Sequence, residues 1–296
     1  MPDDPVFEVV HFVGNAGTLV ADVRRATAPR GLALMFHGGG QTRHSWDRAA
    51  MDLQAARWTV IAVDARGHGD SDWSASGNYD FGSLGEDVVR VVEQSRALPM
   101  VPTSRPVLFG ASMGGISILM AEAAHAPLAA GLVLVDITPK VERAGVDRIM
   151  AFMQGRPEGF GSLEEVADAV AAYQPHRQRA RNPEGLRKNV RRGDDGRFYW
   201  HWDPAFRGIG PNLSDLEQHH QRVTAAARKI TVPTLLVRGA NSDVVSNEGA
   251  DELRRLIPHA QTVNVPGAGH MVAGDDNAVF LGSITPFLES LPGETS

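Results

Sequence analysis

The sequence of 296 residues contains no cysteine. This absence excludes disulfide bridges, thiolate nucleophiles and metal sites built from cysteine. Any side chain that attacks a substrate must therefore do so through oxygen or nitrogen.

Long hydrophobic runs are missing as well. No segment approaches the ~20 consecutive apolar residues of a membrane-spanning helix. The first residues, MPDDPVFEVV, are acidic where a secretory signal is basic and then apolar. We therefore expect a soluble, cytoplasmic protein that has no membrane partner.

Positive charge is not in excess, because 29 Lys and Arg residues against 35 Asp and Glu residues give a formal net charge of −6. A nucleic-acid partner requires a concentrated positive face, so none is expected. A small, neutral substrate suits this balance better. The sequence leaves the oligomeric state open, with a homodimer among the possibilities.

Six short, nearly continuous apolar runs are typical of parallel strands that are buried on both faces. Two earlier β-rich runs, separated by the turn signal GNAG, predict an antiparallel hairpin at one edge. Helical patterns follow most of the apolar runs, as in residues 83–98 and 247–257. The sequence therefore predicts an α/β fold with a mostly parallel, eight-stranded sheet and flanking helices. The six runs are LALMF (32–36), TVIAV (59–63), VLF (107–109), GLVLV (131–135), TLLVR (234–238) and TVNV (262–265).

One long interval interrupts this alternation. Residues 139–232 show several helical patterns and no convincing strand, and Ser162 with Glu165 forms a capping box ahead of one of the helices. We interpret residues 139–232 as an inserted helical cap and residues 1–138 and 233–296 as the core.

The stretch VLFGASMGG, residues 107–115, places one serine between glycines where a strand gives way to a helix. Ser112 in this context is a candidate nucleophile, because the strand–turn–helix arrangement of a nucleophile elbow exposes the serine hydroxyl. A bare Gly-x-Ser-x-Gly match is weak evidence on its own. The strand before it and the helix after it make the pattern informative.

Serine needs a base, and His270 is our candidate because it alone among the histidines weighed follows the last strand in a glycine-rich loop, PGAGHMV. An acid must then orient the imidazole. We predict Asp243, on the strand that follows the cap, in keeping with the chain order Ser, Asp, His. Asp136, which ends the strand at 131–135, is the alternative.

The oxyanion formed by attack on a carbonyl needs two N–H donors. The residue after the nucleophile, Met113, supplies one candidate. The loop HGGG supplies the other, with the N–H of Gly39 preferred and that of Gly40 next. This glycine run lacks the lysine and serine of a phosphate-binding loop. No cofactor or metal is expected, because the pair His219-His220 lacks the i, i+4 spacing of helical zinc ligands.

Five segments, FHGGGQTRHSW, VDARGHGDSD, GASMGG, LLVRGANSD and GAGHMV, together resemble the α/β-hydrolase superfamily. The resemblance covers nearly the whole chain and is to capped members related to bacterial esterases, lactonases and non-haem haloperoxidases. It implies Ser112, Asp243 and His270 as a triad and residues 139–232 as a lid. The HGGG run is similar to the hormone-sensitive-lipase group, but Ala111 stands where that group has an acidic residue, so no subgroup is assigned.

These features predict a serine hydrolase that cleaves a carboxylic ester or lactone through an acyl-enzyme. Two alternatives stay open. The same triad serves carbon–carbon bond hydrolysis or perhydrolysis, and the fold also serves ligand-binding proteins without turnover. In the cap, Trp200 and Trp202 either line an acyl pocket or pack internally. The basic run at 177–197 either attracts a substrate carboxylate or forms a solvated face.

Overall fold

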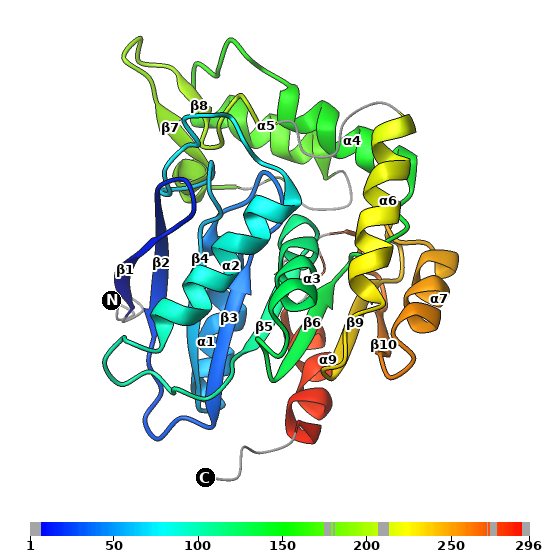
Figure 1. Ribbon diagram of the computed structural model, residues 1–296. Helices are drawn as coiled ribbons and strands as arrows, with labels where there is room; N and C mark the ends of the chain where they lie inside the picture. Colours follow the sequence, from blue (N-terminus) through cyan, green and yellow to red (C-terminus); the bar gives the residue numbers. More distant parts are fainter. Residues whose placement is uncertain are drawn as a thin grey trace.

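The computed structural model describes residues 7–174, 179, 181–206, 213–270, 272 and 277–291 (Figure 1). The strands are β1 (Glu8–Val13), β2 (Thr18–Arg24), β3 (Gly31–Phe36), β4 (Trp58–Val63), β5 (Val107–Ala111), β6 (Gly131–Val135), β7 (Val190–Arg192), β8 (Phe198–Trp200), β9 (Thr234–Gly239) and β10 (Gln261–Val265). The α-helices are α1 (Asp47–Ala55), α2 (Phe81–Ser95), α3 (Met113–His125), α4 (Arg143–Gln154), α5 (Leu163–Tyr173), α6 (Leu213–Ala227), α7 (Asn247–Leu256) and α9 (Asn277–Ser290). Two 3₁₀ helices are η1 (Arg43–Trp46) and η2 (Pro183–Asn189).

The main sheet has eight strands in the order β1-β2-β4-β3-β5-β6-β9-β10. β1 pairs antiparallel with β2, and β2 pairs antiparallel with β4, whereas every pairing from β4 to β10 is parallel. The edge hairpin and the mostly parallel sheet predicted from the sequence are therefore confirmed. β3, β4 and β6 are buried along their whole length, because helices cover both of their faces.

Helices cover the two faces of the sheet. α2, α3 and α6 pack side by side on one face, where their apolar stripes share one core cluster with the strands. α1 and α9 cover the other face and share a second cluster. Among the described residues, no helix combines the length and the apolar character that crossing a membrane requires.

Between β6 and β9 the chain leaves the main sheet. α4, α5, β7 and β8 lie over the end of the sheet at which the parallel strands terminate (Figure 1). The Ser162 hydroxyl accepts the Glu165 N–H at 3.3 Å, so the predicted helix start is confirmed. The Glu165 carboxylate accepts the N–H of Gly161 at 2.9 Å rather than that of Ser162, which closes the capping box one residue early.

Two features of this interval differ from the expectation. β7 and β8 form a two-stranded antiparallel sheet, which the sequence did not indicate because each strand has only three residues. α6 also lies within the interval, yet its residues Val223, Ala226 and Ala227 belong to the core cluster beside α3. The elements that lie above the site therefore precede α6.

Candidate active site

Ser112 stands at the tight turn between β5 and α3. Its backbone has φ 46° and ψ −113°, a conformation that non-glycine residues rarely adopt. A Cβ added to Gly114 would lie 2.2 Å from the carbonyl oxygen of Phe36, and one added to Gly110 would lie 2.5 Å from the backbone of Gly114. The two glycines are therefore required for the strand and helix to approach closely enough to form this turn.

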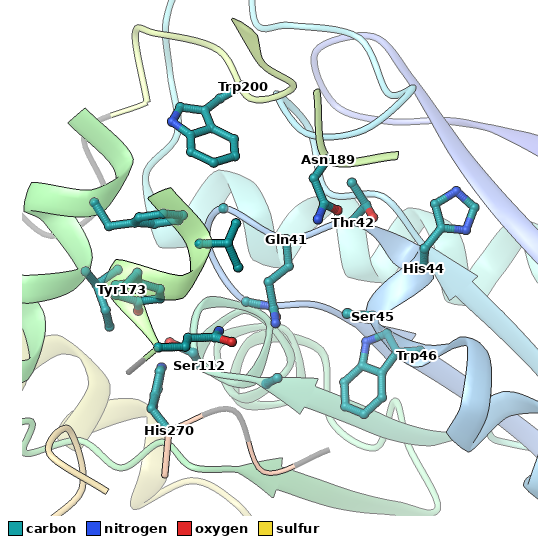
Figure 2. A pocket seen from close by; sticks show the side chains of 18 of the residues that line it. Gln41, Thr42, His44, Ser45, Trp46, Ser112, Tyr173, Asn189, Trp200 and His270 are labelled. Atoms are coloured by element: carbon teal, nitrogen blue, oxygen red, sulfur yellow. The ribbon is translucent and has the colours of Figure 1, made fainter. Parts of the chain in front are cut away.

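His270 follows β10, as the sequence predicted. Its Nδ1 lies 2.8 Å from Oδ2 of Asp136, and its side chain is 7% exposed. Because a carboxylate only accepts, Nδ1 is the donor in this contact, and in the neutral ring Nε2 then has a lone pair. His270 and Ser112 line the same cavity (Figure 2).

Asp136 is fully buried directly after β6, in a left-handed conformation with φ 49°. Its backbone N–H donates to Val237, and its Oδ1 accepts the N–H of Gly239 at 2.9 Å. Oδ2 accepts the hydroxyl of Ser242 in addition to the His270 ring. Several donors thus fix this carboxylate in one orientation toward the imidazole.

The prediction of Asp243 as the partner of His270 is wrong in this structure. Asp243 pairs instead with Arg148 on α4, with Nη2 and Oδ2 2.8 Å apart and both side chains about 40% exposed (41% and 38%). The turn after β9 directs Ser242 inward to Asp136. It also brings the backbone of Asp243 against Gly145, where an added Cβ would lie 2.4 Å from the backbone carbonyl oxygen of Asp243. The alternative acid, Asp136, occupies the position beside the histidine.

The N–H groups of the glycine run after β3 differ in their partners. The N–H of Gly38 donates to Gln41 at 2.9 Å, and the N–H of Gly40 donates to Nε2 of His68 at 3.1 Å. Within the part of the chain that the structure describes, the N–H of Gly39 has no hydrogen-bond partner, and Gly39 lines the cavity with Ser112. Met113 is the first residue of α3, where backbone N–H groups have no partner within the helix. This arrangement favours the N–H of Gly39 over that of Gly40 as the second candidate donor to an oxyanion.

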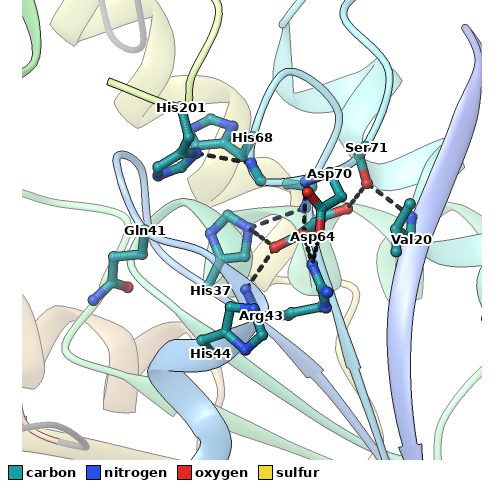
Figure 3. Close-up of polar contacts among 12 residues, drawn as sticks. Val20, His37, Gln41, Arg43, His44, Asp64, His68, Asp70, Ser71 and His201 are labelled. Carbon is teal, nitrogen blue, oxygen red and sulfur yellow. Dashed lines mark hydrogen bonds and ion pairs between the residues drawn. The ribbon is translucent and has the colours of Figure 1, made fainter. Parts of the chain in front are cut away.

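Three buried histidines that the sequence analysis did not assign to the site join its loops (Figure 3). The ring centroids of His37 and His68 are 5.3 Å apart, and those of His68 and His201 are 5.8 Å apart. His201, which follows β8, accepts the N–H of Gly69 at 2.7 Å, and His37 accepts the N–H of Ala65 at 3.0 Å. The only sequence signals were a histidine beside glycine at 37–38 and again at 67–69.

Burial keeps these three rings neutral. It lowers the pKa of His37 to about 4 and that of His68 to about 3, and it lowers the pKa of His201 well below 6.5. Their hydrogen bonds to backbone groups need the neutral form, since each ring accepts an N–H. The cluster therefore connects the glycine loop, the loop after β4 and the segment after β8 without adding charge.

The cavity above Ser112 has a volume of about 270 Å³. One part of its wall is apolar and comes from α4, α5, η2 and β8: Ile149, Phe152, Val170, Tyr173, Leu186 and Trp200. Another part is polar and comes from the glycine loop, η1 and η2: Gln41, Thr42, His44, Lys188 and Asn189 (Figure 2). A substrate would therefore meet an apolar wall and a polar rim.

Trp200 and Trp202 take different roles, which the sequence left open. Trp200 lines the cavity. Trp202 stacks on the Trp200 ring, with the ring centroids 4.8 Å apart, and donates its indole N–H to the carbonyl of Met153. In the basic run, residues 177, 178 and 180 lie outside the described residues. Lys188, also within that run, lines the cavity.

Comparison with known proteins agrees with the fold. The family model described as alpha/beta hydrolase fold matches residues 33–276, so the chain belongs to the α/β-hydrolase superfamily. An esterase of Mycobacterium tuberculosis is 32% identical over 271 residues, which cover 88% of this chain and 83% of the relative. The 2-(acetamidomethylene)succinate hydrolase of Mesorhizobium japonicum is 28% identical over 290 residues, which cover 95% of this chain and 96% of the relative.

A solved structure of the mycobacterial esterase shares the architecture. It is 28% identical, covers 97% of this chain and 94% of its own, and has a TM-score of 0.73. Transition metal inhibition is described for that esterase.

Proposed function

We propose that this chain is a serine hydrolase that cleaves a carboxylic ester or lactone through an acyl-enzyme. The observation that carries the proposal is the 2.8 Å contact between buried Asp136 and His270, because His270 lines one cavity together with Ser112, which stands at a strained elbow. This is the set of groups that activates a serine hydroxyl. The name of the mycobacterial relative, an esterase, agrees with it.

In the proposed reaction the Ser112 Oγ attacks the ester carbonyl while Nε2 of His270 removes its proton. Asp136 holds the proton on Nδ1, which keeps Nε2 as the acceptor, and it stabilises the imidazolium that forms. The histidine then protonates the leaving alcohol. In the second half it activates the water that releases the acid and restores Ser112.

We further propose that the N–H groups of Gly39 and Met113 hold the oxyanion. The free Gly39 N–H in the described part of the chain supports this assignment, and so does the position of Met113 at the start of α3, where the helix dipole also favours negative charge. Backbone donors of this kind are already oriented, so they stabilise the developing charge without reorganisation. We propose no cofactor. We also propose residues 139–232 as an insertion between two parts of the core, 1–138 and 233–296, in which the elements before α6 form the cap and α6 packs beside α3 on the core.

A second candidate is hydrolysis of a substituted succinate, the substrate type in the name of the Mesorhizobium relative. The specific observation in its favour is the cation Lys188, which lines the polar rim, because a cation there would meet a substrate carboxylate. The apolar wall formed by α4, α5 and β8 favours the ester.

Transition metals are proposed as inhibitors rather than as cofactors. Such inhibition is described for the mycobacterial esterase, and the catalytic groups proposed here need no metal.

The test of the proposed function is turnover of neutral p-nitrophenyl esters, a lactone and a substituted succinate by the purified protein. We expect the neutral esters to be cleaved fastest and Ser112→Ala to lower kcat/KM by roughly 10⁴ or more, because the triad acts as a unit. Circular dichroism checks that the variant is folded. Equal turnover by the folded variant would overturn the proposal, and faster turnover of the succinate would establish the second candidate.

A further inference from the structure

A second group of chemically active side chains lies on the rim of the cavity. It consists of Asp22 on β2, His44 in η1 and Asp47 at the start of α1. One ligand atom from each of the three side chains lies within 4.8 Å of the others. Nδ1 of His44 is 3.7 Å from Oδ2 of Asp22 and 3.6 Å from Oδ1 of Asp47.

We propose that Asp22, His44 and Asp47 bind one divalent transition-metal ion of the zinc type. Zinc bound to imidazole nitrogen and carboxylate oxygen has bond lengths of about 2.0–2.2 Å, so the ligand atoms of a regular tetrahedron lie about 3.4 Å apart. The two distances from His44 exceed this edge by only a few tenths of an ångström. The three ligand atoms lie within 4.8 Å of one another, so rotation of the partly exposed His44 and Asp47 side chains would bring them to this spacing, and water would occupy the fourth position.

The buried carboxylate oxygen of Asp22 is an independent observation that points to a ligand. The side chain is 4% exposed, and Oδ2 has no hydrogen-bond partner among the described residues. Its other oxygen, Oδ1, accepts Nε of Arg43 at 2.8 Å. A buried, unpaired carboxylate oxygen is costly unless it finds a partner, and Oδ2 faces Nδ1 of His44 at the centre of the group.

The charges around the group also suit a cation. Asp47 is partly exposed, and Nζ of Lys188 lies 3.4 Å from its Oδ2, so this carboxylate already pairs with a cation. Carboxylates outnumber the fixed cations in the connected network, and Figure 3 shows its part around Arg43. The described members of the network are Asp22, Asp47, Asp64, Asp70, Arg43 and Lys188.

The position of the group predicts an effect on turnover. His44 and Lys188 both line the cavity that contains Ser112, and Nζ of Lys188 lies 3.4 Å from Oδ2 of Asp47. A metal bound to Asp47 and His44 would compete with Lys188 for the Asp47 carboxylate. It would also hold this part of the cavity rim in one conformation. Figure 2 places His44 on the side of the cavity away from Ser112 and His270. The ion would thus hinder access of the substrate and leave the proposed triad intact, a consequence that rests on the proposed function.

The experiment is calorimetric titration of the full chain, freed of any purification tag, with Zn²⁺ and with Mg²⁺ as a hard-cation control. We expect one equivalent of Zn²⁺ to bind and Mg²⁺ not to compete. His44→Gln and Asp47→Asn should each weaken Zn²⁺ binding by at least about tenfold. The matched control is His125→Gln, which alters an exposed pair whose His125 Nε2 and Glu86 Oε1 are 3.1 Å apart, and it should bind Zn²⁺ as the wild type does.

Unchanged Zn²⁺ affinity in folded His44→Gln and Asp47→Asn, or no binding by the wild type, would overturn the site. The remaining interpretation would then be that His44 is only a bridge between two aspartates. Binding is measured without a substrate, so it stands even if the proposed ester hydrolysis fails. In an active enzyme, Zn²⁺ should lower kcat/KM with half its effect near the calorimetric Kd, and a chelator should reverse it. Strong binding without inhibition would refute the predicted effect on access.

Discussion

Among single residues, the acid that partners His270 is the most informative. Chain order allows two aspartates, and the structure places one of them, Asp136, beside the imidazole. Asp136 and Asp243 both lie between Ser112 and His270 in the sequence, and both follow neighbouring parallel strands. Order alone therefore leaves the choice open. Asp136 comes directly after a fully buried strand, whereas Asp243 follows a turn and contacts Arg148 at the surface.

We predict that Asp136→Asn lowers kcat/KM by roughly 10⁴, because an asparagine at this position favours the wrong tautomer of the histidine. Asp243→Asn should lower it by less than about tenfold, since an exposed ion pair contributes only about 0–1 kcal/mol. Steady-state kinetics of the two variants on a neutral ester measure the difference. A greater loss in Asp243→Asn would return the acid role to Asp243.

Sequence reasoning could nominate Ser112 and His270 as candidates, because each stands at the end of a strand in a glycine-rich setting, and the two line one cavity. It could not find the contact from Ser242 to Asp136, which depends on how the turn after β9 folds back. Likewise, the metal-binding group on β2, η1 and α1 has no spacing motif, because its three ligands meet only in the folded chain.

At the scale of elements, the histidine cluster joins segments that are distant in the sequence. His37 and His68 belong to loops of the core, and His201 follows β8. The apolar runs predicted the strands that end at these loops, because buried parallel strands need continuous hydrophobic residues. The contact of His201, which follows β8, with the loops of the core could not be predicted, since the histidines carry no periodic pattern.

The lowered pKa values of the cluster predict that acid destabilises the fold. An unfolded histidine takes up a proton below about pH 6.5, whereas His37 stays neutral down to about pH 4 and His68 down to about pH 3. The unfolded state then binds more protons, so stability falls as the pH is lowered through this window. The slope is on the order of 1.4 kcal/mol per pH unit for each histidine.

Urea unfolding of the wild type and of His68→Gln at pH 7 and pH 5 measures this effect. The free energy of unfolding of the glutamine variant should depend less on pH, because about one proton fewer is taken up on unfolding. His125→Gln serves as the exposed control. Equal pH dependence in the wild type and His68→Gln would show that His68 titrates alike in the folded and unfolded states.

In the whole molecule, the α/β-hydrolase fold brings the carboxyl ends of the parallel strands β3, β5, β6 and β10 to one end of the sheet. The loops that follow these strands form the candidate site there. The sequence revealed this because five motifs stand in order at strand ends. The substrate could not be predicted in the same way. The walls of the cavity come from α4, α5, η2 and β8, and which of their side chains face inward depends on packing.

If Ser112 is the nucleophile that forms the proposed acyl intermediate, a fluorophosphonate should modify it covalently, and intact-protein mass measurement detects the adduct. Attack by the Ser112 oxygen on phosphorus expels fluoride and leaves a stable adduct. We predict one adduct per wild-type chain, located on the peptide that contains Ser112. Asp136→Asn should be labelled more slowly, and Ser112→Ala should not be labelled. An unlabelled wild type, or an adduct that persists in Ser112→Ala, would contradict it.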